Sequence, residues 1–184
     1  MKKTIVDGSA LWKRMTEKDR VKGGVAVASG SEEIVHIYSD GACKGNPGPG
    51  GYGTILVYKG AEKELSGGEA RTTNNRMELL GAIEGLRALK RPSQVELISD
   101  SKYLVDGMTK GWAKSWQAKG WVKSDKKPAL NPDLWEELLR LTAVHRVEFH
   151  WIKGHAGHPY NERCDRLAVA QAERFLKKGD GSER

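Results

Sequence analysis

The hydrophobic pattern of this 184-residue chain changes its period near Asn74, and that change limits the folds it can adopt. Before it, apolar and polar residues alternate in IVHIYSD, at 34–40, and strand-like runs follow at 51–60 and 61–70, with a tight turn expected at Lys59–Gly60. After it, apolar residues recur every three or four positions, as on one face of a helix. Three strands joined by short connections predict an antiparallel meander that leads into a helix.

The later segments alternate between strand and helix. VELIS at 95–99 and VEFHWI at 147–152 are short apolar strands, and helices are expected at about 101–108, from Asn131 onwards and from about Pro159 towards 177. Strands that are separated by helices pair in parallel. The predicted fold class is therefore α/β, with a mixed five-stranded sheet of three antiparallel and then parallel strands, flanked by helices.

The length leaves room for one domain with a substantial core. Residues 1–33 have no sustained period and include the small-residue stretch VKGGVAVASGSEE, so we expect a loosely ordered N-terminal extension with a short helix at about Ala10–Arg20. The folded domain is expected at 34–176, followed by a C-terminal tail at 177–184.

The net charge of +7 favours a polyanionic partner. The extension holds seven basic and five acidic residues, so most of the excess lies in the rest of the chain. Part of it is concentrated in Lys110–Lys127, where six lysines and one acid alternate with Trp112, Trp116 and Trp121. This segment can be a nucleic-acid contact, or the tryptophans can be core residues beneath a solvated lysine face.

Two further features of the sequence indicate in which cellular compartment the protein is expected. No run of about 18 apolar residues exists and the N-terminus lacks an apolar signal core, so neither a membrane span nor secretion is expected. Cys43 and Cys164 lie far apart and form no CxxC pair. We therefore expect reduced thiols in a cytoplasmic protein rather than a disulfide or a zinc site.

Four acids occupy positions where ligands gather in α/β folds, at strand ends and helix starts. Asp40 ends the first strand, Glu78 lies early in the first long helix, Asp100 follows VELIS, and Asp165 lies early in the last helix. Carboxylates that converge repel one another unless cations bind them, and an oxygen-only ligand set suits Mg²⁺. Two such ions about 4 Å apart can activate water and stabilise the leaving oxygen of a phosphodiester.

Each acid also has a simpler interpretation. Asp40 in the sequence SDG can cap a turn, Glu78 can be a solvated helix charge, and Asp100 can be a helix N-cap. Asp165 can pair with a neighbouring arginine on the surface. Taken without further information, the four positions predict a possible metal site in a mixed α/β domain.

Five irregular strings narrow the choice further. SDGACKGNPGPGGYG, TTNNRMELLGAIEGL, SDSKYLVDG, DKKPALNPDLWEELL and WIKGHAGHPYNERCDRLA occur in this order and span about 33–172. They resemble the bacterial-type type 1 ribonucleases H. The resemblance implies a ribonuclease H catalytic domain at 34–176, a ribonuclease H-like fold, and Mg²⁺-dependent endonucleolytic hydrolysis of the RNA strand of RNA–DNA hybrids, without base specificity and with 5′-phosphate and 3′-hydroxyl products.

The resemblance also implies roles for individual residues. Asp40, Glu78, Asp100 and Asp165 match the family's metal-binding carboxylates. Asp40 would bridge two Mg²⁺ ions, for which Mn²⁺ can substitute, and Asp165 would hold the ion that carries the attacking water. Glu78 and Asp100 would hold the ion at the leaving oxygen. His155 matches an auxiliary histidine that assists proton transfer or product release, and His158 is the weaker candidate.

Substrate contacts follow in the same way. The glycine-rich loop after Asp40 would approach the minor groove, where the 2′-hydroxyl distinguishes RNA from DNA. The residues that match the family's minor-groove contacts are Cys43, Asn46, Asn74 and Asn75. A phosphate pocket for the DNA strand would be formed by Arg71, Thr73 and Asn131. A basic handle, which would also bind the DNA strand, would consist of Trp116, Lys119, Trp121 and Lys123. Trp112 is expected to pack. A monomer is expected.

Two positions depart from the common family pattern. Lys102 stands where many relatives have a glutamine that contacts substrate, and Arg166 stands where an acid is common. Lys102 can still reach a phosphate or sugar. Two rival functions remain, a hybrid-binding protein with an inactive site and a DNA-cutting nuclease of the same fold; the intact carboxylates oppose the first, and the hybrid-reading loop and basic handle oppose the second.

Overall fold

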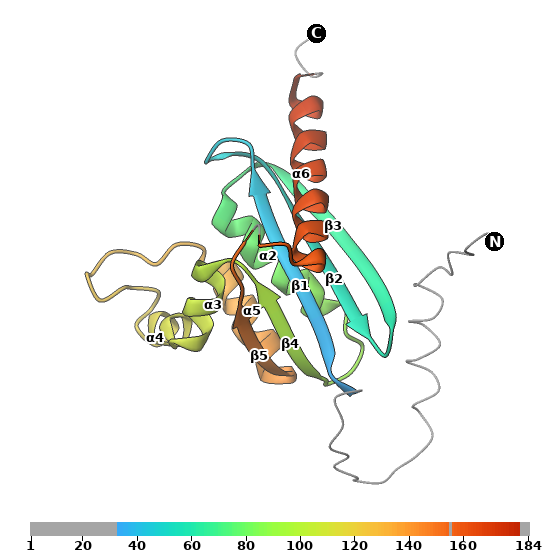
Figure 1. Ribbon diagram of the computed structural model, residues 1–184. Helices are drawn as coiled ribbons and strands as arrows, with labels where there is room; N and C mark the ends of the chain where they lie inside the picture. Colours follow the sequence, from blue (N-terminus) through green and yellow to red (C-terminus); the bar gives the residue numbers. More distant parts are fainter. Residues whose placement is uncertain (1–32, 155, 181–184) are drawn as a thin grey trace, which may run out of the picture.

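The computed structural model describes residues 33–154 and 156–180 (Figure 1). One five-stranded sheet has the order β3-β2-β1-β4-β5. The strands are β1 (Val35–Cys43), β2 (Gly48–Tyr58), β3 (Ala61–Thr72), β4 (Gln94–Ser99) and β5 (Arg146–Trp151). The helices are α2 (Asn74–Arg87), α3 (Lys102–Thr109), α4 (Trp112–Ala118), α5 (Pro132–Val144) and α6 (Pro159–Asp180). The expected helix at Ala10–Arg20 and His155 lie outside the described residues.

The strand directions confirm the predicted mixed sheet. β1, β2 and β3 pair antiparallel, whereas β4 pairs parallel with both β1 and β5. The turn predicted at Lys59–Gly60 is present, and both residues have positive φ, of 48° and 78°. Two consecutive residues of this conformation match the twist of a two-residue hairpin.

The glycine-rich stretch is mostly strand, which corrects the expectation that the first strand ends at Asp40. β1 continues to Cys43, which pairs with Gly50, so only residues 44–47 connect β1 to β2. The glycines are needed because helices approach the sheet closely. A Cβ on Gly51 would lie 2.4 Å from the Ala168 carbonyl oxygen of α6, and one on Gly53 would lie 2.2 Å from that of Cys164.

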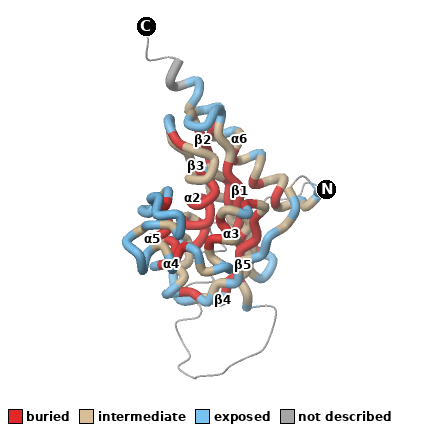
Figure 2. The backbone as a smooth tube through the Cα atoms, turned by 90° about the vertical axis from the view of Figure 1, so that its left-hand side faces the viewer, coloured by how far each residue is buried: buried red, intermediate tan, exposed pale blue. Residues whose placement is uncertain are grey.

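The helices cover the sheet unequally. α6 lies across β1 and β2 on one face, and α2 lies against β1 on the other, with α5 packed beside α2 (Figure 1). Buried residues concentrate where the strands meet α2 (Figure 2). No helix in the described ranges is both long and apolar enough to span a bilayer.

The fully buried Trp135 of α5 is the largest side chain of the core. Its ring contacts Tyr103 edge-on, with centroids 5.2 Å apart, and its Nε1 donates to the Tyr103 hydroxyl at 3.0 Å. α3 can lie against this ring only because position 107 is glycine, since a Cβ there would be 2.3 Å from a ring carbon. Trp135 and Gly107 therefore fix how α3 packs on α5.

We expect Gly107→Ala to lower the free energy of unfolding by about 1–3 kcal/mol, because the buried indole has no room to move. Urea denaturation in EDTA measures this. The matched control is Gly81→Ala in α2, where the nearest atom would be 3.3 Å away. There the gain in helix propensity, about 1 kcal/mol, offsets the tighter contact. Equal stability of the two variants would contradict this account of the α3–α5 contact.

Candidate active site

Two of the four acids are brought together by strand pairing. The parallel register of β1 and β4 ends with Ser39 opposite Ser99, and the next residue on each strand is an aspartate, Asp40 or Asp100. Because the strands run the same way, both aspartates lie at one end of the β1–β4 pair. Asp40 is buried and its Oδ1 accepts a hydrogen bond from the Gly41 N–H at 2.7 Å. The turn-capping interpretation of Asp40 is wrong, because Asp40 lies within β1, where it pairs with Gly53.

Glu78 joins them because α2 approaches β1 at a glycine. A Cβ on Gly41 would lie 2.5 Å from the backbone nitrogen of Glu78, so only glycine lets the helix come this close. Glu78 is 5% exposed, which excludes its interpretation as a solvated helix charge. Its Oε1 accepts from Asn74 Nδ2 at 3.3 Å, whereas its buried Oε2 has no hydrogen-bond donor among the described residues.

The three carboxylates form a compact group. One oxygen from each of Asp40, Glu78 and Asp100 lies within 4.8 Å of the others. Burial, and then the charge of Asp100, raises the pKa of Asp40 to about 7. Burial, followed by Asp40 and Asp100, raises the pKa of Glu78 well above its ordinary value. Hard cations suit such a site, because they supply the charge that the protein does not and take the oxygen ligands it offers.

Asp165 stands apart from this compact group. It lies in α6, where its charge contributes to raising the pKa of Asp40, but its carboxylate is not within the 4.8 Å cluster. No ion pair of Asp165 occurs among the described residues, so the surface-pair interpretation has no support there. The structure therefore brings three of the predicted acids into contact and places the fourth beside them.

Asp100 does not cap a helix. The N-cap of α3 is Ser101, whose Oγ accepts from the Leu104 N–H at 3.3 Å. Asp100 instead contacts two residues that were not among the predicted site residues: Trp151 Nε1 donates to its carbonyl at 2.9 Å, and Asn161 Nδ2 donates to its carboxylate at 3.2 Å. They lie 51 and 61 residues away in the chain, so only the tertiary structure could identify them.

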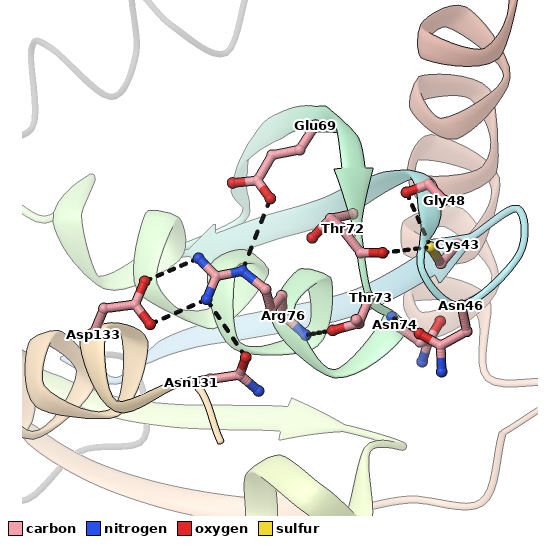
Figure 3. A network of polar contacts seen from close by, with 10 residues as sticks. All are labelled: Cys43, Asn46, Gly48, Glu69, Thr72, Thr73, Asn74, Arg76, Asn131 and Asp133. Carbon is pink, nitrogen blue, oxygen red and sulfur yellow. Dashed lines mark hydrogen bonds and ion pairs between the residues drawn. The ribbon is translucent and has the colours of Figure 1, made fainter. Parts of the chain in front are cut away.

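Several predicted substrate residues lie together at the N-terminal end of α2 (Figure 3). We call this group the polar shelf; it consists of Cys43, Asn46, Arg71, Thr73, Asn74 and Asn75. Asn46 Oδ1 accepts from the Asn74 N–H at 3.3 Å, and Thr73 caps α2 by accepting from the Arg76 N–H at 3.3 Å. The half-buried Cys43 thiol contacts the carbonyls of Gly48 and Thr72, both at 3.4 Å. Arg71 is exposed and Asn75 half-buried at the same end of α2.

Arg76 links this shelf to α5, a role that the sequence did not reveal. Its guanidinium donates to both Asp133 oxygens, at 3.0 and 2.9 Å, and to Asn131 Oδ1 at 3.4 Å (Figure 3). Asn131 has φ 57° and also donates to the Tyr103 hydroxyl at 3.2 Å. The expected phosphate-pocket residues Thr73 and Asn131 are therefore joined through Arg76.

The expected basic handle lies away from the sheet, beyond α3 (Figure 1). α4 places Trp112 and Trp116 on one helix face, as predicted, with ring centroids 6.3 Å apart. The expected division of roles is wrong as regards packing: Trp112 is 40% exposed, whereas Trp116 meets the ring of the buried Trp135 edge-on at 5.9 Å. Trp121 also packs against the core in part, Lys119 is exposed, and Lys123 pairs with Asp125 at 3.4 Å.

Lys102 and the remaining histidine candidate lie at the rim. Lys102 is exposed, with its Nζ 4.8 Å from the centroid of the Trp151 ring. His158 packs against Tyr38, with ring centroids 5.4 Å apart, and its Nδ1 is buried without a partner among the described residues. His158 therefore contributes to packing at the start of α6.

The comparisons with known proteins agree with this geometry. A family model described as RNase H matches residues 32–173. The chain is 61% identical over 139 residues to a ribonuclease H of Desulforamulus reducens, covering 76% of this chain and 87% of that protein. It is 54% identical over 148 residues to a ribonuclease H of Caldanaerobacter subterraneus subsp. tengcongensis, covering 80% and 97%.

Solved structures show the same likeness. LC9-RNase H1, described as a type 1 RNase H with the type 2 active-site motif, superposes with a TM-score of 0.69 at 35% identity, covering 80% of this chain and 76% of that one. LC11-RNase H1, solved in complex with an RNA/DNA hybrid, superposes with a TM-score of 0.60 at 25% identity, covering 77% and 99%.

We expect Asp40→Asn to stabilise the metal-free protein above pH 7. The pKa of Asp40 is about 7 when folded and 3.8 in the unfolded reference, so its stabilising contribution is complete below pH 4 and is lost as the pH rises through 7. An amide cannot ionise and avoids this loss, which amounts to roughly 2–4 kcal/mol. Urea denaturation in EDTA at pH 4 and pH 8 measures the difference.

The control for that experiment is Glu136→Gln, which neutralises an exposed acid of α5. It should change stability little at either pH, because solvent screens exposed charges. If Asp40→Asn stabilised the protein equally at pH 4 and pH 8, ionisation of the Asp40 carboxylate would not be what destabilises the metal-free fold.

Proposed function

Because this chain belongs to the ribonuclease H family, we propose that it hydrolyses the RNA strand of RNA–DNA hybrids with the help of divalent cations. The observation that carries this proposal is the buried group of Asp40, Glu78 and Asp100, in which Glu78 Oε2 lacks a donor. A cation would satisfy that oxygen and offset the mutual repulsion of the carboxylates. The relative solved with a bound RNA/DNA hybrid supports the choice of substrate.

The all-oxygen donor set favours Mg²⁺, with Mn²⁺ as a substitute. Two ions would activate water and stabilise the leaving 3′ oxygen, giving 5′-phosphate and 3′-hydroxyl ends. Asp40, on which the charges of both Asp100 and Asp165 act, would serve as a ligand for both ions, while Glu78 and Asp100 would hold the ion at the leaving oxygen. Asp165, next to the group on α6, would hold the ion on the side of the attacking water. His155 is proposed to assist proton transfer or product release.

The polar shelf is proposed to read the minor groove. The amides of Asn46, Asn74 and Asn75 offer both donors and acceptors, which suits a ribose 2′-hydroxyl, and Cys43 lies beside them. Arg71, Thr73 and Asn131 are proposed to bind a phosphate of the DNA strand, at the N-terminus of α2 where backbone N–H groups favour anions. Lys102 is proposed as a further polar contact near Asp100.

The basic handle is proposed to bind the DNA strand through Trp116, Lys119, Trp121 and Lys123. The catalytic domain is proposed to comprise 34–176, with 1–33 as an N-terminal extension and 177–184 as a C-terminal tail. The free thiols of Cys43 and Cys164 suit a reducing compartment, and we propose that the protein acts as a monomer in the cytoplasm.

We expect an end-labelled RNA strand to be cleaved only when it is paired with DNA and only with Mg²⁺. The same strand alone, paired with RNA, or incubated with EDTA serves as the control. Asp40→Asn should abolish cleavage while the variant still binds the hybrid, because the substitution removes a metal ligand and leaves the shelf and handle in place. Tight hybrid binding by the wild type without cleavage would favour the rival binding protein, and cleavage of paired DNA would favour the rival DNA nuclease.

We expect Lys119→Ala to weaken hybrid binding and to flatten its salt dependence. Lys119 is exposed on the handle, and each lost phosphate contact reduces the slope of log K against log salt by roughly 0.9. Fluorescence anisotropy in EDTA over a series of KCl concentrations measures the slope. Lys90→Ala, at an exposed lysine after α2, is the matched control and should leave the slope unchanged.

A further inference from the structure

Asn161, the third residue of α6, is a polar side chain that the fold buries almost completely, with 4% of its surface exposed. A buried amide costs about 1–3 kcal/mol for each polar group left without a partner. Among the described residues, Nδ2 donates to Asp100 Oδ2 at 3.2 Å, whereas Oδ1 has no donor. The fold therefore places beside one of the three clustered carboxylates an amide whose NH₂ group is hydrogen-bonded and whose oxygen is not.

The chemistry of Asp100 decides which way this amide faces. Carboxylate oxygens accept hydrogen bonds and an amide NH₂ group donates them, so the NH₂ group of Asn161 faces Asp100 and Oδ1 is the unpaired atom. The opposite orientation would set two acceptor oxygens against each other. The missing partner of Oδ1 therefore cannot be restored by turning the amide.

Asp100 is held from two other directions. The indole N–H of Trp151, at the end of β5, donates to its carbonyl at 2.9 Å. Gly154, in the connection to α6, brings the backbone close to the carboxylate, since a Cβ there would lie 2.3 Å from Asp100 Oδ2. Trp151 thus holds the Asp100 backbone, and Asn161 donates to its carboxylate.

Two residues at the site thus each keep a buried acceptor oxygen without a donor among the described residues, Glu78 Oε2 and Asn161 Oδ1. Glu78 can relieve its deficit by binding a proton or a cation. The amide oxygen of Asn161 is not appreciably basic, so its deficit is met by a hydrogen-bond donor or by a cation, and not by a proton. Mg²⁺ usually keeps several waters when bound to proteins, and such water is a suitable donor.

We propose that Asn161 is a positioning residue of the metal site, which fixes the Asp100 carboxylate through Nδ2 and accepts through Oδ1 a hydrogen bond from water in the hydration shell of the bound cation. This proposal rests on the proposed function for the presence of the cation. It assigns to Asn161 a role that is separate from any contact with nucleic acid. Groups that orient metal ligands in this way typically change metal affinity or activity by about 10- to 100-fold when removed.

The test is a calorimetric titration of the metal-free protein with Mn²⁺, in the absence of nucleic acid. Asn161→Ala removes both functions of the amide, and Asn161→Leu removes them while keeping a side chain that branches at Cγ and is larger. We expect Mn²⁺ to bind about 10- to 100-fold more weakly to each variant. The Mg²⁺ concentration for half-maximal cleavage should rise by a similar factor, while hybrid affinity in EDTA stays unchanged.

Gln171→Ala provides the matched control. It removes a side-chain amide from the same helix, one whose Nε2 donates to Ser66 Oγ at 3.0 Å on the exposed side of β3. Its Mn²⁺ affinity should equal that of the wild type. Thermal unfolding in EDTA should show that Asn161→Ala is folded; if the bulkier leucine prevents folding, the alanine variant decides.

A folded Asn161→Ala variant with Mn²⁺ affinity within about twofold of the wild type would overturn the proposal. A loss of hybrid binding in EDTA with unchanged Mn²⁺ affinity would also overturn it, because Asn161 would then act on the nucleic acid. If the wild type bound Mn²⁺ but did not cleave hybrids, the proposed function would fail, whereas weaker Mn²⁺ binding by the Asn161 variants would still support the positioning role.

Discussion

The parallel pairing of β1 with β4 is the contact on which the rest of the site depends. It ends at Ser39 and Ser99 and so delivers Asp40 and Asp100 to one place, next to the point where Gly41 admits α2 and Glu78. The carboxylate group raises the free energy of the metal-free fold, since burial and the neighbouring charges disfavour ionisation of Asp40 and Glu78. The sheet and α2 must therefore supply enough packing energy to hold charged groups together.

The sheet is packed between helices on both of its faces. Glycines in β1 and β2 let α2 and α6 approach from opposite faces, so that the strands that carry the site are enclosed on both sides. On the far side of α2, Arg76 joins the start of the helix to α5 through Asp133 and Asn131. Arg76 also bonds to Thr73, so the residues that we propose to recognise substrate take part in the α2–α5 contact.

Much of the fold could be predicted from the sequence. The change from a two-residue to a helical period gave the order of strands and helices, and the turn at Lys59–Gly60 was located from its residue types. Other expectations were wrong because they depend on packing. The glycine-rich stretch that follows Asp40 was expected to be a loop because glycine is common in loops, yet Gly41 lies in β1 and Gly50 in β2. Gly51 and Gly53 of β2 lie beneath α6. Trp112 was expected in the core, but Trp116 is the one that meets Trp135.

The sequence by itself determined the strand and helix order, the family, and three acids that the structure clusters, because these depend on local periodicity and on residue types at fixed spacings. Only the tertiary structure decided that Glu78 is buried against Asp40, that Arg76 reaches Asp133, and that Asn161 faces Asp100. Those contacts join residues between 38 and 61 positions apart in the chain. Their formation depends on how strands and helices pack in three dimensions, which no local pattern of residues records.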